Sequence, residues 1–104
     1  MTRGEVWWAN LPSPAGRRPV LIVTRTSAVP ARNQLVVAQI TRTIHNIPAE
    51  VPLAQPDGMP QSCVVNCDVL LTVPKSRLER KIAKLSGQKM AEVDAALRFS
   101  LELP

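Results

Sequence analysis

The sequence predicts a mainly β (α+β) domain, built as a small β-barrel or strongly curved antiparallel sheet with a carboxy-terminal helix. Three observations predict this fold. Several short segments are rich in β-branched and other apolar residues, Pro and Gly separate these segments, and one helical repeat occupies the end of the chain. A chain of 104 residues has room for one core, so we expect a single domain spanning residues 1–104.

The first two strands lie in the amino-terminal quarter. Residues 5–11 contain Val and Trp side chains that favour strands, and a loop of Pro, Ser and Gly follows up to Gly16. The next strand is expected from Pro19 to about Arg25, because Val20–Val23 is an unbroken apolar run typical of a strand covered on both faces. Proline cannot donate a ladder hydrogen bond, so it suits the first position of that strand.

Three further strands are predicted in the middle of the chain. Pro30 prevents residues 28–33 from forming a long helix, so we expect an irregular connection there. The apolar run at 35–41 predicts a second core strand, and residues 50–53, interrupted by a proline, suit an edge strand. After a turn-rich loop, residues 63–72 predict a long strand or a strand with a kink.

The end of the chain changes from strand to helix. A turn after Pro74 leads to a strand near residues 81–85, and Ser86 suits the N-cap of the helix that follows. Apolar residues then recur at steps of three and four, and we expect their side chains to pack on the sheet. These residues are Met90, Val93, Leu97 and Leu101. We also expect Trp7 and Trp8 to lie largely in the core or at an interface.

Charge limits the classes of partner. Thirteen Lys and Arg against eight Asp and Glu give a net charge of +5 and a pI near 10, which favours a polyanion such as RNA, DNA or an acidic protein tail. A basic protein that binds no anion has the same composition, so the motifs must decide.

No apolar stretch approaches the roughly 20 residues of a membrane span, and the first residues lack a secretory apolar region. We therefore expect a cytoplasmic protein without a membrane partner.

Two cysteines and one histidine leave little material for a metal centre. On one face of an extended strand, Cys63 and Cys67 would lie about 13 Å apart, too far for a disulfide, so both are expected to be buried thiols. With His45 as the only histidine, a structural zinc site of four protein ligands is not easily assembled. We expect neither a metal nor a cofactor, and no Ser, His and acid set of an ordinary hydrolase is recognisable.

Polar and charged residues stand at the ends of the predicted core strands. If neighbouring ends converge, they surround one anionic group with guanidinium, hydroxyl and amide donors, as phosphoryl transfer at an RNA linkage requires. The alternative is that the arginines are solvated in loops and that the basic run at residues 75–84 is a solvated face. The candidates are Arg17 and Arg18 before one strand, Thr41 and Arg42 after another, and Ser62 and Asn66 beside a third.

Five blocks occur in a specific order between Arg3 and Leu103. The first reads Arg-Gly-Glu-Val-Trp, the second contains Arg-Pro-Val, the third ends a strand with Ile-Thr, and the last enters a helix with Leu-Ser. The blocks are Arg3–Trp8, Gly16–Val23, Gln39–Thr43, Gln61–Asn66 and Leu85–Leu97. Together they resemble the MazF/PemK family of toxin endoribonucleases. The resemblance implies an SH3-like barrel, a homodimer, cleavage of single-stranded RNA at short sequences, and a MazE-type antitoxin with an acidic disordered tail.

The resemblance also implies roles for residues at matching positions. The family's catalytic arginine falls on Arg18, its threonine on Thr41, and a serine near the substrate groove on Ser62. In the family's proposed mechanism the RNA 2′-hydroxyl attacks the adjacent phosphorus and leaves a 2′,3′-cyclic phosphate and a 5′-hydroxyl. Arg18 would stabilise the charge on phosphorus, with or without a proton-shuttle role, and Thr41 would bind a phosphoryl oxygen. The other expected substrate-binding residues are Arg17, Arg42 and Asn66.

Two other classes of function fit the same barrel. A gyrase-poisoning toxin of this fold acts through carboxy-terminal residues that typically include a tryptophan, whereas this chain ends Leu-Glu-Leu-Pro. A non-catalytic nucleic-acid-binding barrel needs only the basic charge, so the pair Arg18 and Thr41 favours the endoribonuclease.

The chain departs from the family pattern at two places. Arg42 replaces the serine or threonine that often follows the threonine in the family, and the loop before Arg17 is short. Because groove loops select the bases, the resemblance leaves the cleavage sequence open.

Overall fold

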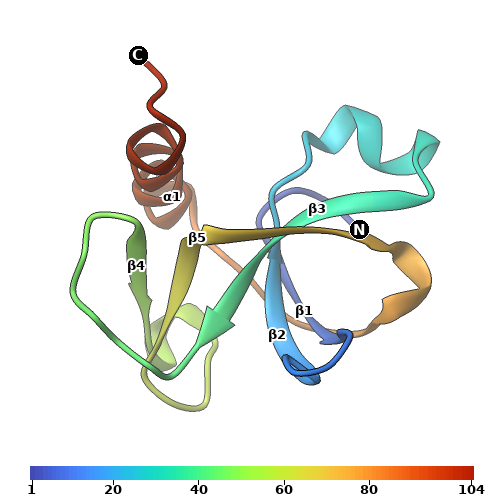
Figure 1. Cartoon of the computed structure of the whole chain (residues 1–104), viewed down its shortest axis with the longest axis horizontal. Helices are drawn as coiled ribbons and strands as arrows, with labels where there is room; N and C mark the ends of the chain where they lie inside the picture. Colours follow the sequence, from blue (N-terminus) through green and yellow to red (C-terminus); the bar gives the residue numbers. More distant parts are fainter.

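Six strands form one antiparallel sheet in the computed structural model, which describes residues 1–104 (Figure 1). The order across the sheet is β4-β5-β3-β2-β1-β6. The strands are β1 (Glu5–Asn10), β2 (Arg17–Ile22), β3 (Gln34–Thr41), β4 (Glu50–Leu53), β5 (Cys63–Pro74) and β6 (Leu78–Lys84). Helix α1 (Gly87–Leu101) follows, and short 3-10 helices lie at Thr26–Ala31, Gln55–Asp57 and Lys75–Arg77. The predicted mainly β fold with a carboxy-terminal helix is confirmed.

A bend in β5 curls the sheet. Along β3 the pairing partner jumps from Leu70, opposite Ala38, to Asn66, opposite Gln39, so the residues between them bulge out of the ladder. β5 consequently has two arms (Figure 1). The arm after the bulge pairs with the first half of β3, and the arm before the bulge turns towards β4 and α1. Of the two forms expected here, a long strand or a strand with a kink, the structure shows a long strand with a kink, and β4 is an edge strand as expected.

Two strands begin earlier than the sequence predicts. β2 starts at Arg17 instead of Pro19 and ends at Ile22, because Arg17 and Arg18 already pair with the last two residues of β1. β3 pairs with β2 only from Val20, so the missing N–H of Pro19 breaks no hydrogen bond to β3. β6 likewise starts at Leu78, before the predicted position 81, because it pairs with the end of β1.

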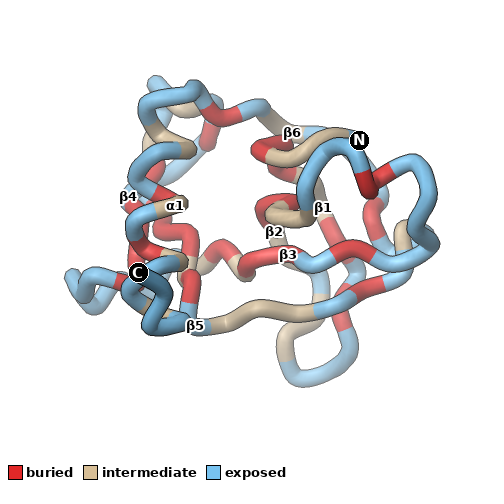
Figure 2. The backbone as a smooth tube through the Cα atoms, turned by 90° about the horizontal axis from the view of Figure 1, so that it is seen from above, coloured by how far each residue is buried: buried red, intermediate tan, exposed pale blue.

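The curled sheet buries apolar side chains on both faces. Alternate residues of β2 point to opposite sides, so Leu21 joins one apolar cluster while Val20 and Ile22 join the other. The first cluster lies between the sheet and α1, where Val93 and Ala96 are buried. Figure 2 shows that most buried residues lie along the strands, while much of the connecting chain is exposed.

Helix α1 begins at the predicted cap but buries less than predicted. The Ser86 hydroxyl accepts a hydrogen bond from the Lys89 N–H at 3.1 Å. Val93 is fully buried, whereas Met90 and Leu97 are half-buried against the first cluster. Leu101 is 51% exposed, so its predicted place in the core is wrong: it lies in the last turn of the helix, by the chain end that projects from the domain in Figure 1. No helix has the length and apolar character that crossing a membrane requires.

Neither tryptophan is a core residue. Trp7 is half-buried, and its indole N–H donates to the buried Glu5 carboxylate at 2.9 Å. Burial raises the pKa of Glu5, but the hydrogen bonds from Trp7 and Thr2 and the charge of Lys81 lower the pKa more, so the net direction is downwards. Trp8 is also half-buried, and its ring lies in a surface pocket.

Candidate functional site

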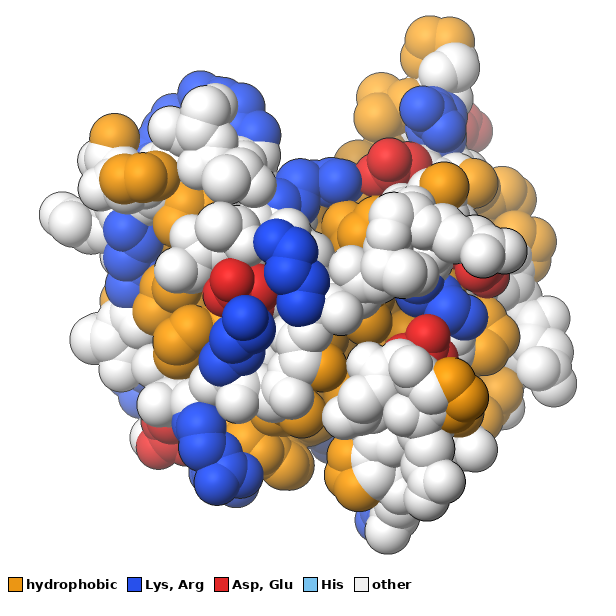
Figure 3. Space-filling model, turned by 180° about the vertical axis from the view of Figure 1, so that it is seen from behind, with side chains coloured by type: hydrophobic (Ala, Val, Ile, Leu, Met, Phe, Trp, Pro, Cys, Tyr) orange, Lys and Arg blue, Asp and Glu red, His pale blue; other side chains and the backbone are white.

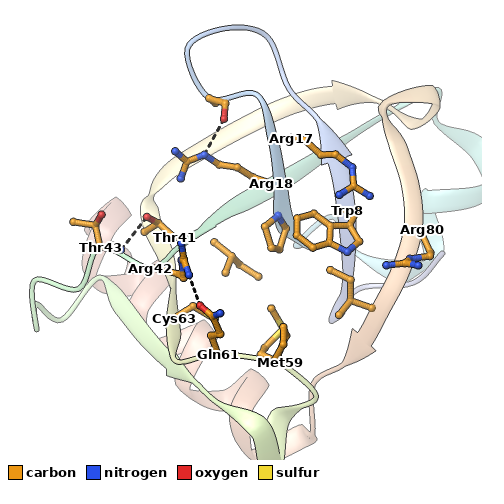
Figure 4. Close-up of a pocket in the computed structure, with 15 residues that line it drawn as sticks. Trp8, Arg17, Arg18, Thr41, Arg42, Thr43, Met59, Gln61, Cys63 and Arg80 are labelled. Carbon is orange, nitrogen blue, oxygen red and sulfur yellow. Dashed lines mark hydrogen bonds between the residues drawn. The ribbon is translucent and has the colours of Figure 1, made fainter.

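A pocket of about 750 Å³ opens where the start of β2, the end of β3, the loop before β5 and the middle of β6 meet (Figure 4). This volume suits a nucleotide-sized ligand. Its apolar lining includes Trp8, Pro19, Ile40, Met59, Cys63 and Ile82. Its polar lining comprises Arg17, Arg18, Thr41, Arg42, Thr43, Gln61 and Arg80. Four of the six site residues predicted from the sequence therefore line one cavity.

The antiparallel pairing of β2 and β3 brings the predicted catalytic residues together. Val20 pairs with Gln39 at the end of the ladder, and Arg18 and Thr41 lie two residues beyond this pair on their own strands. The turn before β2 depends on Gly16, whose φ of +68° is unfavourable for other residues and whose carbonyl accepts from the Leu11 N–H at 2.9 Å. This hairpin fixes the backbone from which Arg18 extends.

One nitrogen of the Arg18 guanidinium is hydrogen-bonded to the protein, and the other two are free to bind a ligand. Its Nε donates to the Ala15 carbonyl at 3.0 Å, and its two terminal nitrogens donate to no protein atom. The side chain is half-buried, so the guanidinium is partly desolvated. Figure 4 shows the guanidinium on the same side of the pocket as Thr41. The free N–H groups therefore suit an anion bound between the two residues.

Thr41 is the last residue of β3 and lines the pocket. The Thr41 Oγ1 accepts from the Thr43 N–H at 3.2 Å, which orients the oxygen and leaves the hydroxyl hydrogen available for an acceptor. The residue is half-buried. A donating hydroxyl beside a free guanidinium is an arrangement that binds a phosphoryl oxygen.

Arg17 lies over an aromatic ring at the rim. Its guanidinium carbon is 4.4 Å from the centre of the Trp8 ring, and its Nε donates to Glu79 Oε1 at 2.9 Å. The cation–π contact and the ion pair, which connects β2 to β6, hold this exposed arginine in one orientation. Arg80 also lines the pocket and forms no ion pair. Figure 3 shows Lys and Arg side chains spread over one face with fewer Asp and Glu between them.

The remaining two predicted site residues lie outside the pocket lining. Ser62 is exposed at its edge, between Gln61 and Cys63, which both line it. Asn66 is half-buried in β5, and its side-chain oxygen accepts from the Asp68 N–H at 3.0 Å. The sequence reasoning missed Gln61, although it is the neighbour of Ser62, and it missed Trp8, Met59 and Arg80 because only the curled sheet brings them together.

The two cysteines are free and buried, as predicted. Burial raises the pKa of Cys63 in the pocket floor, and the negative charge of Asp57 adds to this effect. Burial and the neighbouring Asp68 raise the pKa of Cys67 to about 11. Both thiols are therefore neutral near pH 7 and poor nucleophiles. His, Cys, Asp and Glu side chains form no group of three that could hold a metal ion.

Known proteins are similar to this chain in both sequence and fold. Residues 2–101 match the profile of PemK-like, MazF-like toxins of type II toxin–antitoxin systems. The probable endoribonuclease MazF2 of Mycobacterium tuberculosis is 38% identical over 96% of this chain and 97% of its own length. The M. tuberculosis toxin MazF-mt6 superposes with a TM-score of 0.89 at 32% identity, covering 96% of this chain and 98% of its own.

A mycobacterial endoribonuclease solved in complex with its cognate antitoxin gives the same TM-score of 0.89 at 26% identity, covering all of this chain and 97% of its own. The profile and these similarities extend over nearly the whole chain, including every strand and the helix. The chain therefore belongs to the family of PemK-like, MazF-like toxins of type II toxin–antitoxin systems.

Proposed function

We propose that the pocket cleaves single-stranded RNA at specific short sequences without a divalent metal ion. Family membership makes the chain an endoribonuclease toxin, since its curated relatives carry that name. The observation that supports the site is that Arg18 and Thr41 line one pocket beyond the end of the ladder between β2 and β3, with free donors on both.

In the proposed reaction the RNA supplies its own nucleophile. The 2′-hydroxyl oxygen bonds to the adjacent phosphorus, the bond from phosphorus to the 5′ oxygen breaks, and a 2′,3′-cyclic phosphate and a 5′-hydroxyl result. One proton leaves the 2′-hydroxyl and one reaches the 5′ oxygen, so the reaction consumes none overall. Arg18 stabilises the negative charge that develops on the phosphoryl oxygens, and Thr41 donates to one of them. The Arg18 guanidinium is so weak an acid that it stays protonated, and a protonated group cannot accept a proton as an ordinary general base. Charge stabilisation is therefore its main role.

The arginines beside Arg18 and Thr41 bind the RNA around the cut. Arg17 precedes Arg18 and Arg42 follows Thr41, so both lie at the same end of the two strands. The Arg17 guanidinium suits a phosphate of the RNA backbone, and the Arg42 guanidinium suits a nucleotide next to the cut. Ser62 and Asn66 take more peripheral places, with Ser62 at the edge of the pocket and Asn66 further along β5. The apolar lining between these polar groups provides a surface on which a splayed base can stack.

The same surface suits an antitoxin. A mycobacterial relative is an endoribonuclease in complex with its cognate antitoxin, and other relatives were solved as MazE-MazF from Deinococcus radiodurans. The net charge of +5 and the arginines of the pocket attract an acidic, disordered segment of a MazE-type antitoxin. Such a segment would compete with RNA for the pocket. This pairing and the RNA substrate place the protein in the cytoplasm.

A second copy of the chain completes the assembly in this proposal. Two large apolar side chains remain exposed around a second hollow between the 3-10 helix at Thr26–Ala31, β3, β5 and the end of α1. Val36 is 36% exposed and Leu101 is 51% exposed, and both line this hollow. Exposed apolar patches of this kind mark association surfaces, so we place the homodimer contact there.

The test is incubation with a long RNA followed by mapping of the cut ends, in the presence of EDTA. The expected result is cuts at a recurring short sequence, with 2′,3′-cyclic phosphate and 5′-hydroxyl ends. A substrate with a single 2′-deoxy nucleotide at the cut should stay intact, because the nucleophile is missing. Cleavage of that substrate, or a requirement for Mg²⁺, would contradict the proposed mechanism.

A further inference from the structure

The side chains of Arg42 and Gln61 meet at the mouth of the pocket. Arg42 follows the last residue of β3, and Gln61 lies two residues before β5, so the contact joins two separate connections of the sheet. A terminal nitrogen of Arg42 donates a hydrogen bond to the side-chain oxygen of Gln61 (Figure 4). Both residues line the pocket.

This contact fixes which atoms the pair offers to a ligand. A guanidinium has donors and no acceptor, so the amide oxygen of Gln61 must face Arg42 and the amide nitrogen must face away. That nitrogen donates to no protein atom, and the other N–H groups of Arg42 are likewise free of protein acceptors. Arg42 and Gln61 together therefore present only hydrogen-bond donors.

The backbone that carries Gln61 is tightly held. The Asp57 carboxylate accepts from the Ala54 N–H at 2.9 Å, which closes the turn at the start of this loop. Gly58 has a φ of +90°, and a Cβ built on it would lie 2.8 Å from the Cβ of Ala83 in β6. The loop thus packs directly against β6, and Met59, which is 4% exposed, anchors it in the core. A donor on such a loop is positioned before the ligand arrives.

We propose that Arg42 and Gln61 read one base of the RNA and select a base edge with two adjacent acceptors. Guanine offers O6 and N7, and cytosine offers N3 and O2. On every edge of adenine and uracil that places two polar groups side by side, a donor stands next to an acceptor, so one contact is lost. The half-buried side chains of Pro19 and Ile82 in the pocket lining offer apolar surface for the face of the base. This inference rests on the proposed RNA cleavage.

Arg42 is the part of the pair that excludes adenine. A glutamine amide with both groups free binds adenine through N7 and the exocyclic amine, because it supplies one donor and one acceptor. In this pocket the acceptor is already occupied by Arg42. Removing Arg42 frees the amide oxygen, so Arg42→Ala should shift the preference at this base towards adenine.

The experiment compares cleavage of an RNA library randomised around the cut by the wild type, Gln61→Glu and Gln88→Glu. Gln88 is exposed on α1 outside the pocket, so Gln88→Glu makes the same charge change as a control. For the wild type we expect one position at which guanine or cytosine exceeds adenine by about 5- to 150-fold, the range for one bidentate base contact. Gln61→Glu should lose this preference, and Gln88→Glu should keep it.

A second measurement covers variants that do not cleave. Fluorescence anisotropy with uncleavable 2′-deoxy oligonucleotides, one for each base at that position, should give the same order of affinities. If guanine is preferred, replacing it with 7-deazaguanine, which lacks the N7 acceptor, should remove the preference. If cytosine is preferred and the replacement of guanine by 7-deazaguanine leaves the affinity unchanged, the pair reads the cytosine edge. A wild-type preference for adenine or uracil, or an unchanged profile in Gln61→Glu, would overturn the base-reading pair and leave RNA cleavage intact. Absence of any wild-type cleavage would instead overturn the proposed function.

Discussion

Arg18 and Thr41 each lie two residues beyond Val20 and Gln39, the pair at which the ladder between β2 and β3 ends, and both line the pocket. The residue of β2 just outside this ladder is Pro19, which has no N–H to donate. The two strands then part, and the pocket occupies the space between them. The end of the ladder at Pro19 thus coincides with the site that the arginine and the threonine line.

The first prediction concerns these two residues. Arg18→Ala and Thr41→Ala should each lower kcat/KM for RNA cleavage by about 10²- to 10³-fold, because each removes a fixed donor to the phosphoryl group. The measurement is cleavage of a short fluorogenic RNA. Circular dichroism should show an intact fold for both variants. Near-normal activity in folded Arg18→Ala would mean that Arg18 is a solvated loop residue without a catalytic role.

The second prediction separates the arginine in the pocket from its neighbours in the basic run. Affinity for single-stranded RNA should fall with salt, and Arg80→Ala should reduce the slope of log K against log salt by about 0.7, because one phosphate contact is lost. Arg77 is exposed in the same segment and lies outside the pocket. Arg77→Ala should therefore leave the slope unchanged. Equal effects of the two variants would mean that the whole run binds RNA as a diffuse charge.

The sequence predicted the kinds of elements better than their ends. Apolar runs and breakers located all six strands, since these patterns depend on local chain chemistry. The start of β2 was missed because Arg17 and Arg18 pair with β1, a contact made by the hairpin and invisible in two charged residues. The start of β6 was missed for the same reason, and Leu101 was misplaced because helical spacing does not say where the sheet beneath a helix ends.

The candidate site was predictable where it depends on strand ends. Arg18 and Thr41 lie at the ends of two neighbouring antiparallel strands, so they converge as expected. Asn66 was predicted beside them because of its place in the chain, but the bulge in β5 shifts its pairing and it does not line the pocket. Trp8 and Gln61 enter the site through the curling of the sheet, which no local pattern encodes.

The third prediction tests the face of α1. Val93→Ala should lower the free energy of unfolding by about 2 kcal/mol, because it removes two buried methyl groups from a fully enclosed site. Leu97→Ala should cost less than the about 2 to 5 kcal/mol of a fully buried leucine, since Leu97 is half-buried. Urea titrations measure both. A larger loss for Leu97→Ala than for Val93→Ala would mean that the helix faces the sheet differently.

The fourth prediction concerns self-association through the second hollow. Leu101→Asp should shift the protein towards monomer, because it places a charge in the proposed apolar contact while leaving the core unchanged. Sedimentation velocity at micromolar concentration measures this shift. Glu102→Asp, one residue further along the exposed end of the helix, is a matched control that should leave the association unchanged. A wild type that is already monomeric would contradict the homodimer.

The last prediction uses the raised pKa of Cys67. Burial keeps this thiol protonated up to about pH 11, whereas in the unfolded chain it loses its proton near pH 9. The native state therefore holds the proton more tightly, so the stability from this group is complete below pH 9 and is lost as the pH rises towards 11. In Cys67→Ala this part of the decline should be absent, even though the smaller side chain lowers stability at every pH. Urea unfolding of the wild type and the variant from pH 8 to pH 11 measures the difference, in which the shared titration of the lysines cancels. A constant difference over that range would show that the native thiol ionises as easily as the unfolded one.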